Sequence, residues 1–188
     1  YQLASGLSQD VETDDNVFRQ TTARLPWLII GMLGGIGNSM ILGNFDATFA
    51  AHPEMALYIP LIGGTGGNVG TQSSALIVQG LANSSLDSKN TLKQVAKEAV
   101  VALINATIIS LLVYTYNFIR FGAMATVTYS VSISLFAVVM FASIFGTLVP
   151  MTLERLKIDP AIATGPFIAI TNDIIGMMLY MGITVLLS

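Results

Sequence analysis

One carboxylate stands deep inside an apolar stretch near the C-terminus. Asp173 lies close to the midpoint of residues 160–188 and is the charged residue of the apolar segment 161–187. An ionised side chain at the centre of a bilayer costs roughly 2.5–3.5 kcal/mol on insertion scales. No Lys or Arg stands at similar depth in another apolar segment, so an ion pair cannot offset this cost. Asp173 is therefore protonated, hydrogen-bonded to polar neighbours, or met by a mobile cation in water.

The residues around Asp173 favour the cation. At helical spacing Asp173 shares one small or polar face with Gly165, Ala169, Asn172 and Gly176. Thr164 and Pro166 are expected to loosen the helix and to free carbonyl oxygens near Gly165. Carboxylate, carbonyl and amide oxygens suit hard cations such as Mg²⁺ or Ca²⁺. One carboxylate is weak for a divalent ion, and a two-fold dimer that pairs two Asp173 side chains would balance its charge.

A second polar feature is the glycine-rich stretch 60–82, which begins Pro-Leu-Ile-Gly-Gly-Thr-Gly-Gly-Asn-Val-Gly. Six of its first eleven residues are Pro or Gly, which predicts a poor regular helix. At membrane depth, irregular polar backbone survives only where it is buried in protein or lines water. Its uncharged polar residues are therefore candidates for a pore lining, together with Asn172: Thr65, Asn68, Thr71 and Gln72. For this stretch taken alone, tight helix packing is the structural alternative.

The composition places both features in a membrane. The 188 residues are 53% hydrophobic and 10% charged, with a mean hydropathy of +0.71, whereas soluble domains are about 25% charged. Five segments are long enough to cross a bilayer: residues 25–43, 55–82, 99–118, 123–150 and 161–187. We predict an all-α integral membrane protein with five transmembrane helices. A polar, acidic segment of residues 1–23 precedes the membrane domain of residues 24–188.

The basic residues predict an orientation. Five spans place the two termini on opposite sides, and an inward N-terminus leaves only Arg120 on the outer side. The inner side then carries the other seven basic residues: Arg19, Arg24, Lys89, Lys93, Lys97, Arg155 and Lys157. This distribution follows the positive-inside rule. We therefore expect a multi-pass inner-membrane protein with a cytoplasmic N-terminus. Its third helix would begin near residue 91, with Ser88 as a candidate cap.

Several other site classes are excluded. The glycines are not followed by the Lys of a phosphate-binding loop. Ser73 and Ser74 have no base within a span, and an intramembrane aspartyl protease would need a second Asp at depth. The chain has no Cys and one His, and no basic run indicates nucleic acid. We predict that the chain is not an enzyme, and that its other intramembrane amides form hydrogen bonds between helices: Asn38, Asn105 and Asn117.

Three stretches of this sequence resemble the MgtE family of magnesium channels and transporters. They are Pro60–Gln72 with Gly80-Leu-Ala82, Arg24-Leu-Pro-Trp27, and Asp159-Pro160 through Pro166 to Asp173. The resemblance covers residues 24–188 and implies a homodimer whose axial ion path is lined by the second and fifth helices. It also implies Mg²⁺ binding at Asp173, with pore-lining groups around Asn68. Family members usually carry upstream cytoplasmic regulatory domains. The opening Tyr1 suggests that such domains were removed from this chain, and a natural short form is the alternative.

Two positions differ from the family pattern. Gln79 stands where an Arg is common, and Gly165 stands where an Asn can help to coordinate the ion, so only the backbone of Gly165 could contribute. We predict transport of Mg²⁺, or of another divalent cation, through a dimeric pore with metal contacts at Asp173, Gly165 and Ala169. One alternative is a divalent cation–proton exchanger, in which Asp173 alternates between proton and metal. The other is a non-transporting membrane scaffold with a protonated Asp173.

Overall fold

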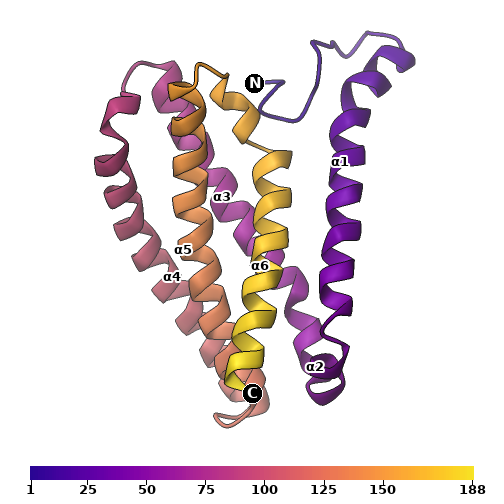
Figure 1. Ribbon diagram of the computed structural model, residues 1–188, viewed down its shortest axis with the longest axis vertical. Coiled ribbons are helices and arrows are strands. Elements are labelled where there is room, and N and C mark those ends of the chain that lie inside the picture. Colours follow the sequence, from indigo (N-terminus) through magenta and orange to yellow (C-terminus); the bar gives the residue numbers. More distant parts are fainter.

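Long helices run between two opposite ends of the molecule, as the computed structural model shows (Figure 1). They are α1 (Val17–Gly43), α3 (Ile59–Ala82), α4 (Thr91–Phe121), α5 (Thr126–Arg155) and α6 (Pro166–Leu187). Shorter elements connect them: α2 (Asp46–Ala51) and the 3₁₀ turns η1 (Pro53–Tyr58), η2 (Ser88–Asn90) and η3 (Pro160–Ala163). The structure describes residues 1–188, Ser88 by its backbone alone. Among these residues there is no strand, so the prediction of an all-α fold is confirmed.

Four segments are long and apolar enough to cross a membrane. They are α1, α4, α5 and the segment from η3 through α6, residues 160–187. The remaining long helix, α3, has 24 residues but is too rich in glycine and polar residues to qualify by composition. Figure 1 shows that α3 nevertheless runs from one end of the molecule towards the other. The prediction of five spans is thus confirmed for four segments and stays a prediction for α3.

The helix ends differ from the sequence prediction mainly at the N-terminal side. α1 begins at Val17, because the Asn16 side chain caps it by accepting a hydrogen bond from the Arg19 amide at 2.9 Å. Pro26 therefore lies inside the helix, and residues 17–23 of the polar N-terminal segment belong to α1. α4 begins at Thr91, as predicted. Ser88 was expected to cap this helix, but its side chain lies outside the described part of the structure.

α5 is the central helix of the bundle and packs against α3, α4 and α6. Its approach to α3 is close because both helices present glycine: a Cβ on Gly146 would lie 2.6 Å from the carbonyl oxygen of Gly70. At the other end of the bundle, the Tyr180 hydroxyl of α6 donates to the Met55 carbonyl at 2.8 Å. The buried Asn117 of α4 accepts a hydrogen bond from the Tyr58 hydroxyl. Such small-residue contacts and hydrogen bonds between helices are the forces that hold helices together in a bilayer.

The glycine-rich stretch is a regular α-helix, so the prediction of a poor helix was wrong. α3 runs without interruption through Gly63, Gly66 and Gly70. Each of these glycines faces another helix, and an added Cβ would overlap Asp173, Val138 and Asn172 respectively. Tertiary packing thus overrides the low helix propensity of glycine, and these three glycines allow the tight helix packing that the alternative reading expected.

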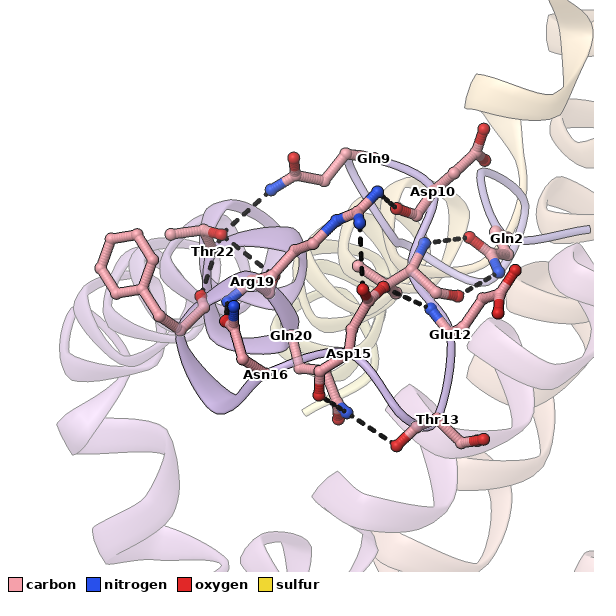
Figure 2. Close-up of polar contacts among 12 residues, drawn as sticks. Gln2, Gln9, Asp10, Glu12, Thr13, Asp15, Asn16, Arg19, Gln20 and Thr22 are labelled. Atoms are coloured by element: carbon pink, nitrogen blue, oxygen red, sulfur yellow. Dashed lines mark hydrogen bonds and ion pairs between the residues drawn. The ribbon is translucent and has the colours of Figure 1, made fainter.

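The N-terminal residues fold back over the start of α6. The Gln2 side-chain amide donates a hydrogen bond to the Val11 carbonyl and accepts one from the Val11 backbone N–H. The Arg19 guanidinium donates to the Asp15 carboxylate at 3.0 Å (Figure 2). The Thr164 hydroxyl donates to the Ala4 carbonyl at 3.1 Å. Residues 1–16 are therefore attached both to α1 and to the turn that precedes α6.

The glycine contact between α3 and α5 gives a stability prediction. In Gly146→Ala the new Cβ would meet a backbone oxygen that cannot rotate away, so the helices must separate. We expect a loss of about 1–3 kcal/mol, measured as a lower unfolding temperature of the detergent-purified protein. Gly35→Ala is the matched control, because a Cβ there meets nothing within 4 Å. Equal unfolding temperatures for Gly146→Ala and Gly35→Ala would contradict the packing.

Candidate functional site: a carboxylate in a groove between α3 and α6

An open groove of about 400 Å³ lies between α3 and α6. α3 contributes most of its lining, and α6 contributes the rest. The lining residues are Gly63, Gly64, Gly67, Asn68, Thr71, Ala169, Ile170 and Asp173. The α3 residues recur at intervals of three and four, which places them on one face of that helix. The groove is therefore a property of two packed helical faces and not of a loop.

The Asp173 carboxylate is held between two helices. Its Oδ1 atom lies where a Cβ on Gly63 would be, so this oxygen packs directly against the bare backbone of α3. Its Oδ2 atom accepts a hydrogen bond from the Asn38 amide of α1 at 3.3 Å. The glycine thus makes room for the carboxylate, and the amide orients it.

Asp173 has no cationic partner among the described side chains. The ion pairs found there join Asp15 to Arg19 and Glu54 to His52, and neither involves the groove. Asp173 is half-buried, whereas Gly64 and Asn68 beside it are exposed on the open side of the groove. The carboxylate therefore borders an accessible space without a fixed positive charge to balance it.

The structure brings together four of the residues predicted for the site. Asp173 and Ala169 lie one turn apart on α6, and they face Asn68 and Thr71 of α3 across the groove. The lining does not include Thr65 and Gln72, which are also on α3. Both lie about one turn from Asn68, so Asn68 marks the edge of the lining and these two residues lie beyond it.

Gly165 and Asn172 also lie away from the groove. Gly165 precedes the first residue of α6 with a φ of +51°, and eight residues of helix place it roughly 12 Å from Asp173 along the axis. Its carbonyl is not free, because it accepts a hydrogen bond from the Ala169 amide at 3.0 Å. Asn172 is only 1% exposed and faces Gly70 of α3, with no partner for its amide among the described atoms.

Sequence reasoning missed the glycines of the lining and the partner of the carboxylate. Gly63, Gly64 and Gly67 would have been found by reading the glycine-rich stretch as a helix and marking one of its faces. Asn38 was expected to bond between helices, and it does so. Asn117 also bonds to another helix, whereas Asn105 lies on the exposed side of α4. Nothing in the sequence indicates that Asn38 bonds to Asp173, which lies 135 positions away.

The chemistry of the groove is that of oxygen ligands. It presents one carboxylate, the Asn68 amide, the Thr71 hydroxyl and the polar backbone of a glycine-lined helix face. These groups can receive a hard cation or the waters of its hydration shell. The described side chains offer no cluster of three or more His, Cys, Asp or Glu. One chain therefore supplies too few such side chains to replace the hydration shell of an ion.

Known proteins are similar to this sequence over most of its length. The MgtE magnesium transporter of Bacillus subtilis is 30% identical over 183 residues, which are 97% of this chain and 40% of that protein. The corresponding transporter of Thermus thermophilus is 34% identical over 165 residues, or 88% of this chain and 36% of that protein. The chain thus spans about two fifths of the length of these curated relatives.

The family comparison agrees with these relatives. The MgtE family, described as a divalent cation transporter, matches residues 59–183, which include α3, α4, α5 and most of α6. A family of transporters also bears out the prediction that the chain is not an enzyme. The chain belongs to the MgtE family of divalent cation transporters, as its sequence resemblance indicated.

Proposed function

We propose that this chain forms a homodimer in which Mg²⁺ crosses the membrane between two grooves, held by the two Asp173 carboxylates. The observation that carries this proposal is the half-buried Asp173 on an open groove, without a cationic partner among the described side chains. The relatives named as magnesium transporters support Mg²⁺ as the ion.

The exposed side of the groove supports a dimer. Asp173 lies in α6, a candidate span, and Asn68 is exposed beside it. A carboxylate and an amide facing hydrocarbon would be costly, and polar groups at this depth are found against protein or water. A second copy placed groove to groove would cover this surface and leave water between the two faces.

The charges also support two copies. One ionised Asp173 supplies a single negative charge, and a two-fold axis supplies two, which balance one divalent cation. Mg²⁺ gives up its water reluctantly and is often bound by one or two carboxylates with several waters retained. Asn68 and Thr71 on each wall would accept hydrogen bonds from those waters.

The ends of the bundle fit an orientation with the N-terminus inside. Figure 1 shows the two termini at opposite ends of the molecule. This arrangement is expected if α3 is a fifth span, because an odd number of spans puts the termini on opposite sides. The start of α1, the α3–α4 connection and the turn before α6 share one end. All basic residues except Arg120 lie at that end, which makes it the cytoplasmic one by the positive-inside rule.

Replacing the carboxylate tests the function directly. In Asp173→Asn the shape is kept and the charge is lost, so we expect Mg²⁺ flux into liposomes under an imposed membrane voltage to be abolished. Asp14→Asn is the matched control, because it makes the same change at an exposed residue outside the groove. Wild-type flux in Asp173→Asn, with the protein folded and reconstituted, would refute the assignment.

The same assay separates the alternatives. Flux that requires a pH gradient, and that voltage alone does not drive, would support a cation–proton exchanger. Absence of flux in the unmodified chain at every voltage and gradient would support a scaffold.

Gly63 gives a second test, aimed at the position of the carboxylate. In Gly63→Ala the Cβ would occupy the place of Asp173 Oδ1, and the carboxylate can rotate away without unfolding the helix. We expect a folded protein whose half-saturating Mg²⁺ concentration for flux rises about tenfold, equivalent to about 1.4 kcal/mol of lost binding. Gly43→Ala should leave that concentration unchanged, because a Cβ there meets nothing within 4 Å. Equal values in the two variants would show that the contact has no role in ion binding.

The absence of native cysteine allows a test of the dimer. Asn68→Cys would place one thiol on the groove, and a short bifunctional thiol reagent should link two copies in membranes. Leu112→Cys, on the outward side of α4 with 67% of the residue exposed, should not be linked. Denaturing electrophoresis reads the result. Equal linking of both variants, or linking of Leu112→Cys alone, would contradict a dimer that meets at the grooves.

A further inference from the structure

α1 joins the bundle through the helix that carries the carboxylate. Of the long helices, α6 is the one against which α1 packs extensively in the described structure, and Figure 1 shows α1 at the edge of the bundle beside α6. The approach is close: a Cβ on Gly34 would lie 2.5 Å from Cγ2 of Ile170. Gly34 therefore allows the two helices to meet at a distance that a larger residue would prevent.

One turn further along α1, this close approach brings Asn38 to Asp173. The buried residues of α1 are Ala23 and Asn38, and Asn38 is 8% exposed. Its amide nitrogen donates to Asp173 Oδ2 at 3.3 Å. Its Oδ1 atom is buried and has no partner among the described atoms. A buried acceptor without a partner destabilises the folded protein.

The two contacts of the carboxylate differ in kind. Gly63 offers Oδ1 space, whereas Asn38 offers Oδ2 a hydrogen bond. The terminal torsion of an Asp side chain has a broad energy minimum, so packing against a glycine does not by itself fix the plane of the carboxylate. The Asn38 donor, 3.3 Å from Oδ2, supplies that directional constraint.

We propose that Asn38 is a positioning residue for the transported cation. Its amide holds the Asp173 carboxylate in the orientation that faces the groove. The first helix thereby becomes part of the ion site, together with α3 and α6. This inference rests on the proposed function, because it assumes that Asp173 binds the ion.

The test compares two substitutions at Asn38. Asn38→Leu keeps the branched shape of the side chain and removes the donor, whereas Asn38→Gln keeps an amide donor. We expect Asn38→Leu to raise the half-saturating Mg²⁺ concentration for flux about tenfold with little change in maximal flux, and Asn38→Gln to recover most of that loss. In parallel, Mg²⁺ should raise the unfolding temperature of the purified protein less in Asn38→Leu than in Asn38→Gln. Ser39→Leu is the control, because it adds the same side chain at the exposed neighbouring position.

A merely structural role would give another pattern. Asn38→Leu would then lower the unfolding temperature without Mg²⁺ and the amount of active protein, and would leave the half-saturating concentration unchanged. That result, or equal half-saturation in Asn38→Leu and Asn38→Gln, would overturn the proposal. Asp173→Asn in the same assay separates the two failures. If it transports like the unmodified chain, the proposed function fails; if it is inactive while Asn38→Leu keeps normal half-saturation, only the role of Asn38 fails.

Discussion

A carboxylate without a fixed positive neighbour is the constraint on which the rest of this structure depends. Asp173 lies in a helix apolar enough to span a membrane, and its contacts are an amide and a glycine backbone. Neither contact carries a charge, so neither can neutralise the carboxylate as a Lys or Arg would. Under the proposed function, this leaves the negative charge of Asp173 available to the transported cation. A permanent ion pair would satisfy the fold better and would leave a passing cation nothing to bind.

The glycines of α3 make this arrangement possible and bring a cost of their own. Each Gly in a helix interior is less favourable than Ala by about 0.5–1 kcal/mol. In a bilayer the alternative is worse, because backbone groups released from a helix would find no water to bond. Packing then uses the space that the missing side chains leave. Asp173 fits against Gly63, and α5 approaches Gly70 through Gly146. Glycine thus allows close helix packing on one side of α3, at Gly70, and leaves room for a groove on another side, at Gly63, Gly64 and Gly67.

The features that could be predicted from the sequence are those with a local signal. A single charge in an apolar run is visible without a structure, so Asp173 was identified, and long apolar runs gave four of the spans. The regular helix of the glycine-rich stretch was not predicted, because residue propensity ignores what packs against each glycine. Thr65 and Gln72 were grouped with Asn68 because all three are uncharged polar residues of one stretch, and they are also neighbours of Asn68 on the helix. The lining of the groove nevertheless includes Asn68 and leaves the other two out. The link from Asn38 to Asp173 depends on how α1 docks, which no spacing within α1 reveals.

The packing also ties the first part of the chain to the site. The N-terminal segment reaches the start of α6 through the contact of Ala4 with Thr164, and α1 reaches the middle of α6 through Asn38. α6 in turn packs against α3 and α5. A displacement of α6 relative to α3 would therefore alter the groove, and α1 and the N-terminal segment would have to move with α6 or lose these attachments. Because the carboxylate is on α6 and the glycine that receives it is on α3, the width of the groove and the orientation of Asp173 cannot be set independently of where α1 lies.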